Sequence, residues 1–224
     1  MGPGGESIET QEIWVERGGE RLRLLAERAL WWPAQQALLV ADAHFGKAAS
    51  FRRLGVPVPQ GTTGHNLDVL TRLAARHGAR RLLVLGDFLH SVHAHAVETL
   101  SALSAWREAH AALDITLVRG NHDDRAGDPP PSLGITVVDE PLRLDGLALC
   151  HHPRPVSGAY ALAGHLHPCI TVGRGFERLR LPCFHFTAEV GVLPAFGAFT
   201  GMHPVRVARG DEVYAVAGEV VRRV

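Results

Sequence analysis

The sequence has little cysteine and no excess of charge of either sign, and each shortage excludes a class of protein. Only three cysteines, Cys150, Cys169 and Cys183, occur among 224 residues, and none belongs to a CxxC pair. A disulfide framework and a structural zinc site built on thiolates are therefore not expected. The 23 basic and 23 acidic residues balance, so the protein has no net charge that would attract a polyanion. A local basic groove would remain compatible with nucleic acid.

Long apolar runs are also missing. No window of about 18 uninterrupted apolar residues occurs, and a membrane-spanning helix needs roughly that length. The opening residues, MGPGGES, have neither the basic nor the apolar region of a secretory signal. We therefore expect a cytoplasmic protein with reduced thiols and no membrane partner.

The length and composition are those of one folded domain. Apolar residues make up 46% of the chain and charged residues 21%, which is ordinary for a globular protein. The chemically informative motifs run from residue 42 to residue 167. We therefore expect a single domain over 12–224 that follows a flexible N-terminus over 1–11.

Strand and helix signals alternate in the first half of the chain. Gly18 and Gly19 separate two short apolar segments, which indicates a hairpin. Continuous apolar runs predict strands buried on both faces, and helical spacing before Gly78 predicts a helix that ends there. The expected strands cover 13–15, 22–25, 37–41, 82–85 and 115–118, and the expected helices cover a short segment through 52–53, then 63–77 and 92–111.

The second half contains short strands joined by tight turns. A proline-rich break over 128–131 predicts a surface loop, and the Asp145-Gly146 pair predicts a hairpin. The expected strands cover 142–144, 147–150, 160–163, 170–172 and 179–187, followed by a hairpin over 205–221. This order favours an α/β fold, a two-sheet αββα sandwich with helices on the outer faces.

A set of short motifs combines histidine with aspartate or asparagine, and each motif lies beside an apolar run. Taken singly, such motifs are most often surface pairs, turn residues or one exposed face of a strand. Their joint occurrence favours a metal site instead. The residues concerned are Asp42 and His44 in VADAHFGK, Asp87 in LLVLGDF, Asn121 and His122 in LVRGNHD, His151 in LALCHHP, and His165 and His167 in LAGHLHP.

The positions of these residues indicate where the metal site lies. Asp42, Asp87, Asn121 and His151 each follow a short apolar run, and the carboxyl ends of strands meet at one edge of an α/β sheet. Carboxylate and amide oxygens mixed with imidazole suit Mn²⁺, Fe or Zn²⁺ better than Ca²⁺ or Mg²⁺. We expect two divalent ions that share one carboxylate, with Mn²⁺ as the first expectation and Fe or Zn²⁺ as alternatives.

One motif is doubled, because His151 and His152 are adjacent. Successive strand residues point to opposite faces, so only one of the two is expected to face the metals. His151, the first residue after the strand, is the predicted ligand.

In order, the motifs D-x-H, GD, GNHD, a histidine after a strand and GHxH resemble those of the calcineurin-like metallophosphoesterase superfamily. The resemblance covers residues 42–167 and implies two ions that share one aspartate. The first ion would be held by Asp42, His44, Asp87 and His167, and the second by Asp87, Asn121, His151 and His165.

The resemblance also implies a mechanism. Two cations would activate a bridging hydroxide for attack on phosphorus and would clamp the phosphate oxygens. His122 would be the catalytic residue that is not a ligand, stabilising the transition state or protonating the leaving oxygen. Asp123 would orient the His122 imidazole.

Longer segments, around the metal motifs and beyond them, resemble one particular branch of this superfamily. The segments DAHFGK, RRLGVPVPQGTTG, GDFLHS, LPCFHF and LPAFGAFTG resemble the ligase-associated DNA damage response endonucleases, the PdeM family. This resemblance implies DNA as the substrate, a role in DNA repair and a functional association with a DNA ligase and helicase. A homodimer would also be compatible with it. Phe88, Leu89 and His90 replace the acid or arginine that many superfamily members carry after GD.

Several cationic residues near the motifs are candidates for contact with substrate phosphates. They could equally be ordinary solvated charges of a helix. His93 and His95 are expected on a solvated helix start. The candidates are Lys47, Arg52, Arg53 and His90.

Two rival functions remain open. One keeps the chemistry but directs it to small phosphodiesters, nucleotides or phosphoproteins. The other is a catalytically silent binding scaffold, which retention of the whole ligand set disfavours.

Overall fold

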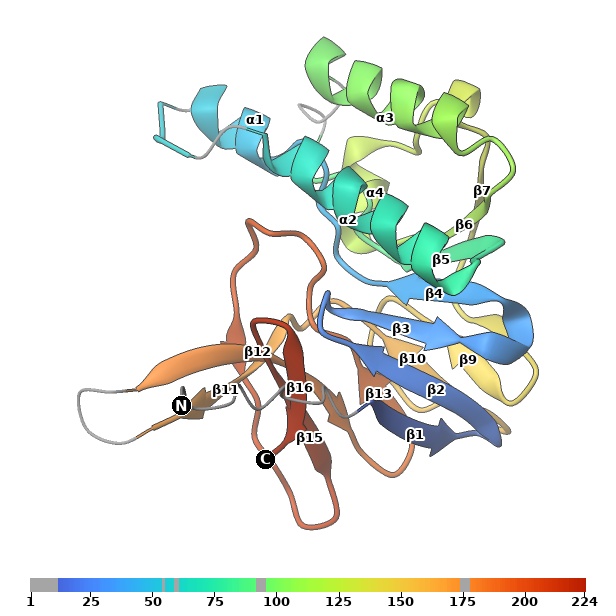
Figure 1. The fold of residues 1–224 in the computed structure, drawn as a ribbon, viewed down its shortest axis with the longest axis vertical. Helices are drawn as coiled ribbons and strands as arrows, with labels where there is room; N and C mark the ends of the chain where they lie inside the picture. Colours follow the sequence, from blue (N-terminus) through green and yellow to red (C-terminus); the bar gives the residue numbers. More distant parts are fainter. Residues whose placement is uncertain (1–11, 54, 59–60, 92–95, 174–177) are drawn as a thin grey trace, which may run out of the picture.

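The structure is a computed structural model that describes residues 12–53, 55–58, 61–91, 96–173 and 178–224. Two β-sheets pack against each other, and the helices gather beyond the first sheet (Figure 1). Residues 1–11, which we predict to be flexible, lie outside the described residues.

The first sheet has an antiparallel half and a parallel half. Strands β1 to β4 are joined by successive antiparallel pairings, which include the hairpin predicted across Gly18 and Gly19, whereas β4 to β7 run parallel. In spatial order the strands are β1 (Ile13–Arg17), β2 (Glu20–Leu25), β3 (Ala29–Trp32), β4 (Ala37–Val40), β5 (Arg81–Leu85), β6 (Asp114–Val118) and β7 (Ile135–Val138).

The second sheet contains the later strands of the chain. At its centre, β9, β10 and β13 run parallel, and β15 with β16 branches from β12. In spatial order the strands are β14 (His203–Pro204), β11 (Pro168–Val172), β12 (Leu179–Phe186), β13 (Val190–Val192), β10 (Tyr160–Ala163), β9 (Leu147–Leu149) and β8 (Leu142–Leu144), with β15 (Glu212–Ala217) and β16 (Val220–Arg223) beside β12.

The described helices all precede β7. The α-helices are α1 (Lys47–Arg53), α2 (Thr62–His77), α3 (Val97–Ala109) and α4 (Asn121–Ala126), and two short 3-10 helices are η1 (Pro33–Gln35) and η3 (Pro131–Leu133). As predicted, α2 ends at Gly78, whose left-handed conformation (φ 60°) lets its N–H reach the carbonyls of the last turn.

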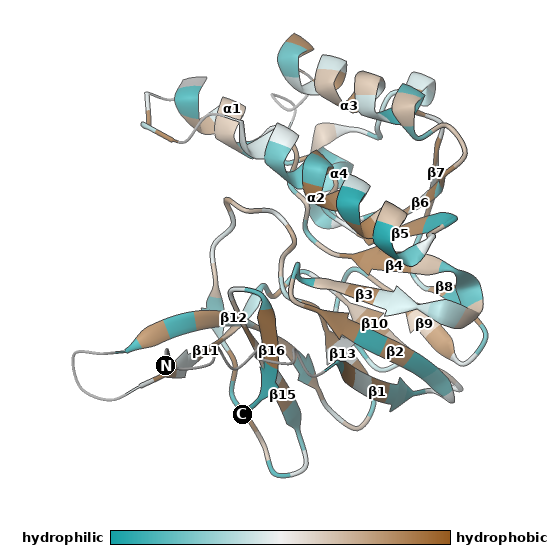
Figure 2. Ribbon diagram, viewed as in Figure 1, coloured by the Kyte–Doolittle hydropathy of each residue, from teal (hydrophilic) through white to brown (hydrophobic). Residues whose placement is uncertain are grey.

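Alternate residues of the parallel strands divide between two apolar clusters. Leu38 of β4 packs with Leu70 of α2 on the helical side, whereas Leu39 packs with Phe184 between the sheets. Figure 2 shows β4 as a brown strand between the helices and the second sheet. Because both faces of these strands are buried, they appear in the sequence as continuous apolar runs.

The predicted two-sheet α/β sandwich is confirmed. The buried apolar side chains of α2, α3 and α4 belong to the cluster on the outer face of the first sheet. No described helix follows β7, so within the described residues the helical layer is confined to the first sheet.

Some boundaries differ from those predicted. Strands β3, β7, β13 and β14 were not expected, and the helix predicted over 92–111 covers 97–109. Residues 92–95 lie outside the described part of the chain. The final hairpin begins at 212 rather than 205, because the Asp211 carboxylate accepts the Ala208 N–H at 2.9 Å and closes a turn there.

No described helix is long and apolar enough to cross a membrane. Cys150, Cys169 and Cys183 are buried free cysteines. Burial raises the pKa of the Cys150 thiol to about 11 and that of Cys183 to about 12, so both stay protonated and pack as small apolar groups.

Candidate metal centre

The predicted ligands lie where parallel strands of both sheets end. Strands β4, β5 and β6 are parallel neighbours in the first sheet, as are β9 and β10 in the second. Two contacts join the two edges. The His165 N–H donates to the Asp42 carboxylate at 2.9 Å, and His151 Nδ1 lies 3.1 Å from the Leu85 carbonyl oxygen. The loops after these strands therefore meet at one place.

One group of predicted ligands consists of Asp42, His44 and His167. His44 Nε2 lies 3.3 Å from His167 Nε2, and His167 Nε2 lies 3.5 Å from Asp42 Oδ1. Asp42 and His44 are buried, and all three side chains can direct one ligand atom to a common point. This group is the set predicted to hold the first ion with Asp87.

A second group surrounds the buried imidazole of His151. Its Nε2 lies 2.9 Å from Asn121 Oδ1 and 3.1 Å from His165 Nδ1. These are the residues predicted to hold the second ion with Asp87.

Asp87 lies between the two groups and directs a different oxygen to each. Its Oδ2 is 3.8 Å from His44 Nε2, and its Oδ1 is 3.5 Å from His151 Nε2. The His122 N–H also donates to Oδ1 at 2.9 Å, which fixes the carboxylate. A single carboxylate thus faces both ligand sets, as sharing between two ions requires.

The donors fit divalent ions by chemistry and by protonation state. Burial lowers the pKa values of His44, His151 and His165, and only neutral imidazole binds a metal. Burial raises the pKa of Asp87, and the nearby carboxylate of Asp42 adds to that shift. Cations between these groups would relieve the cost of burying two carboxylates together.

Strained backbone conformations are concentrated at the predicted ligands. Residues other than glycine rarely adopt a left-handed conformation, which costs of the order of 1 kcal/mol or more. The five ligands concerned have φ between 46° and 69°. Among the eight non-glycine residues of the described chain with positive φ, these five are Asp42, His44, Asp87, His165 and His167.

The glycines of the GD, GN and GH motifs create space for ligands from other motifs. A Cβ on Gly86 would lie 2.1 Å from His151 Nδ1, one on Gly120 would lie 2.5 Å from Asp87 Oδ1, and one on Gly164 would lie 2.7 Å from Asp42 Oδ2. The need for glycine at these positions was not predicted, although the motifs contain the glycines. The side chains that fill the space come from distant segments of the chain, so only the tertiary structure shows why glycine is needed.

Gly86→Ala is expected to displace His151 and to weaken metal binding and turnover together. Gly78→Ala is the matched control, because Gly78 also has positive φ but has no atom within 4 Å of the added Cβ. Metal content and phosphodiesterase activity of both variants check the prediction. Wild-type metal content in Gly86→Ala would contradict it.

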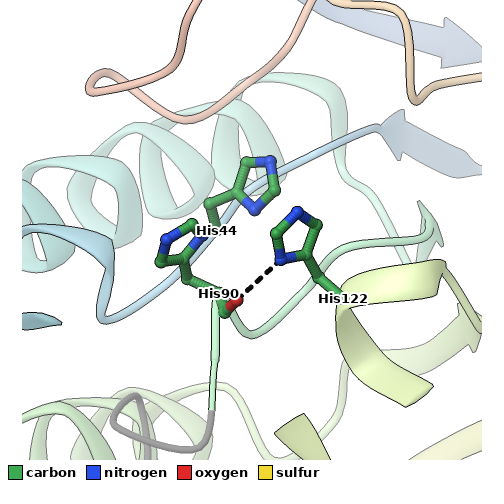
Figure 3. A group of neighbouring side chains, drawn as sticks. All are labelled: His44, His90 and His122. Atoms are coloured by element: carbon green, nitrogen blue, oxygen red, sulfur yellow. Dashed lines mark hydrogen bonds between the residues drawn. The ribbon is translucent and has the colours of Figure 1, made fainter. Parts of the chain in front are cut away.

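Three imidazoles face one another at the first group, as Figure 3 shows for His44, His90 and His122. The His90 and His122 rings are stacked with centroids 5.1 Å apart, and the His44 ring approaches His122 edge-on at 5.0 Å. His122 Nδ1 lies 2.8 Å from the His90 carbonyl oxygen. Because a carbonyl only accepts, Nδ1 carries the proton in neutral His122. Its Nε2, 4.0 Å from Asp87 Oδ2, then offers a lone pair.

Asp123 has a different contact from the one expected. Its two carboxylate oxygens accept the N–H groups of Leu89 at 3.1 Å and Gly120 at 3.0 Å. Burial raises the pKa of this carboxyl to about 6, despite these two hydrogen bonds. Asp123 therefore ties together the loops after β5 and β6, and the His90 carbonyl is the group that contacts the His122 imidazole.

The two adjacent histidines of the doubled motif have different surroundings. His151 is fully buried among the second group of ligands, whereas His152 Nδ1 lies 3.0 Å from a Glu140 carboxylate oxygen. His152 is nevertheless close enough to join His151 and His165 as a third possible donor.

Three of the residues predicted to contact substrate phosphates, Lys47, Arg52 and Arg53, belong to α1. Lys47 begins α1, where burial lowers its pKa against the opposing pull of Asp87 and Asp42. Arg52 lies later in α1 and is half-buried. The side chain of Arg53 and the residues His93 and His95 lie outside the described residues.

Comparison with solved structures links the whole chain to a nuclease. The chain is 44% identical to the Pseudomonas putida nuclease MPE, with a TM-score of 0.85 over 96% of this chain and 100% of that chain. This chain is a metallophosphoesterase of the calcineurin-like family. The phosphoesterase Yfce from E. coli matches at 16% identity and a TM-score of 0.41, over 84% of this chain and 97% of that chain, and adds no support. No family model and no curated protein matches the chain.

An apolar pair follows the GD motif of this metallophosphoesterase. Phe88 and Leu89 are buried in the cluster beneath the helices. The backbone here also pairs with the loop after β4, because the Phe45 N–H donates to the Phe88 carbonyl at 2.8 Å. These residues therefore belong to the core, and His90 is the residue after GD that reaches the metal centre.

Proposed function

We propose that this metallophosphoesterase uses two divalent ions, most favourably Mn²⁺, to hydrolyse phosphodiester bonds of DNA as an endonuclease. The observation that carries the proposal is the position of Asp87, whose two oxygens face two separate ligand groups. A binding scaffold would have no need for a buried, shared carboxylate. The nuclease named among the solved structures supports DNA as the substrate.

The side chains of the centre can each be given a task. Two divalent cations, when bound, would acidify an attacking water and offset the negative charge that develops on the phosphate oxygens. Asp42 accepts the His165 N–H at 2.9 Å and so fixes the turn that carries both His165 and His167. His122, in its imidazolium form, donates the Nε2 proton to the leaving oxygen of the cleaved strand and returns to the neutral imidazole. The His90 carbonyl keeps the other proton on Nδ1, so that Nε2 is the nitrogen that takes up and releases a proton.

The proposed DNA strand lies along the start of α1 and past His90. Lys47 and Arg52 are positioned in α1, directly after the loop that carries Asp42 and His44. Positive charge there would attract neighbouring phosphates and set the register of the strand without reading its bases. Arg53 follows in the same helix.

The biological setting of this activity is also a proposal. The PdeM-like segments DAHFGK and LPAFGAFTG support a cytoplasmic role in DNA repair together with a DNA ligase and helicase. A homodimer would place two such centres along one DNA molecule. Co-purification with the ligase and helicase tests the association, and sedimentation of the purified chain tests the dimer.

A substrate panel tests the activity itself. The protein is stripped with chelator, reconstituted separately with Mn²⁺, Fe²⁺ and Zn²⁺, and assayed on single-stranded, duplex and branched DNA, bis-p-nitrophenyl phosphate, nucleotides and a phosphopeptide. We expect metal-dependent nicking of DNA and hydrolysis of the small diester, strongest with Mn²⁺. Hydrolysis of small diesters without cleavage of any DNA would favour the alternative phosphoesterase function, and no hydrolysis at all would favour a scaffold.

A further inference from the structure

Glu140 connects the first sheet to the turn that carries His151. It lies just after β7, and its side chain is 16% exposed. One carboxylate oxygen, Oε2, accepts the N–H of His151 at 2.7 Å and the N–H of His152 at 2.9 Å. The other, Oε1, lies 3.0 Å from His152 Nδ1 and 3.2 Å from a guanidinium nitrogen of Arg154.

We propose that Glu140 is a positioning residue for the second ion, a role that rests on the proposed function of His151 as a ligand. The sheet ladder ends just before this turn, where the Cys150 N–H donates to the Leu162 carbonyl at 2.9 Å. The next two N–H groups, those of His151 and His152, both bind the Glu140 carboxylate. Their direction, and with it the direction of the His151 side chain, is therefore set by a residue on the connection between β7 and β8.

The carboxylate suits this task because charge-assisted hydrogen bonds are strong and short. The ionised carboxylate can accept all of its donors at once, whereas an amide in its place has only one acceptor oxygen.

This arrangement also gives the second histidine of the doubled motif a role. His152 packs between Glu140 and the ligand His165, with its ring centroid 4.7 Å from that of His165. Its side chain is 44% exposed, unlike the fully buried His151. His152 therefore supports the two ligand imidazoles from the solvent side, held in place by Glu140.

The test compares Glu140→Gln with Asp139→Asn. Gln keeps the size of the side chain but loses the charge and one acceptor. Asp139→Asn makes the same charge change one residue away, on a side chain that is 83% exposed and pairs with Arg119. Arg154→Ala removes only the ion pair on Oε1. All four proteins, including the wild type, are prepared free of metal and titrated with Mn²⁺ by calorimetry, and EPR separates a coupled ion pair from a single ion.

We expect Glu140→Gln to bind the first Mn²⁺ as the wild type does and the second roughly 10- to 100-fold more weakly, since groups that orient metal ligands have effects of that size. Asp139→Asn and Arg154→Ala should bind both ions normally. Two wild-type affinities in Glu140→Gln would overturn the proposal. Equal weakening of both sites, with a lower melting temperature of the metal-free protein, would also overturn it by showing a general role in folding.

The same titrations distinguish failure of the proposed function from failure of the role proposed for Glu140. If the wild-type chain itself does not bind two Mn²⁺ ions, the two-ion site is wrong and the role of Glu140 falls with it. If the wild type binds two ions and Glu140→Gln does as well, only the positioning role is wrong.

Discussion

Asp87→Ala is expected to remove the coupled ion pair and to lower phosphodiesterase turnover by at least about 10³-fold. Two cations contribute several kcal/mol to the transition state, and each 1.36 kcal/mol corresponds to about tenfold in rate. Asp87 directs a different oxygen to each ligand group, Oδ2 at 3.8 Å from His44 Nε2 and Oδ1 at 3.5 Å from His151 Nε2. Elemental analysis and hydrolysis of bis-p-nitrophenyl phosphate measure the two losses.

Asp68→Ala is the control for this substitution, because Asp68 is an exposed carboxylate on α2. It should retain both ions and full turnover. A purified, folded Asp87→Ala protein that still holds two ions, or still turns over at the wild-type rate, would remove the shared-carboxylate mechanism.

His122→Ala is expected to retain both ions and to lose about 10²- to 10⁴-fold in DNA cleavage, the usual contribution of a general acid. The loss should be smaller on bis-p-nitrophenyl phosphate, whose leaving phenolate is stable without a proton. This difference reflects donation of the Nε2 proton by the His122 imidazolium, since the Nδ1 proton is held by the His90 carbonyl at 2.8 Å. The measurement is kcat on both substrates, beside metal content.

His65→Ala is the matched control, since His65 is an exposed histidine on α2. Equal losses on the two substrates would instead assign His122 to stabilising charge on the phosphate. Unchanged DNA cleavage would exclude it from the reaction.

Much of the candidate metal centre could be predicted because the sequence patterns that indicate it lie within short segments of the chain. A ligand directly after an apolar run identifies both the strand and the side chain at its end, as in LLVLGDF for Asp87. Parallel strands buried on both faces need continuous apolar residues, so β4, β5 and β6 were visible in the sequence. Strand β3 was missed because ALWW follows a turn at Arg28, which adopts positive φ without being glycine. No turn residue marks its start.

Contacts between distant segments could not be predicted in the same way. The space that Gly86 leaves for His151 depends on the packing of β5 against the end of β9. The contacts of Glu140 could not be predicted from the sequence, because a lone glutamate before a proline has no spacing that relates it to a metal motif. The hydrogen bonds of Asp123 were not predicted for the same reason, since its partners include Leu89, 34 residues away.

The sequence by itself determined the kinds of ligand, their order and the strands that carry them, because residue chemistry and apolar periodicity are properties of short segments. Only the tertiary structure decided which atoms face each other. It turned the two oxygens of Asp87 toward different imidazoles, buried His151 rather than His152, and placed Glu140, on the connection between the two sheets, against the turn that carries His151. These choices depend on how the two sheets pack face to face, and that packing is a sum of many weak contacts that no single motif encodes.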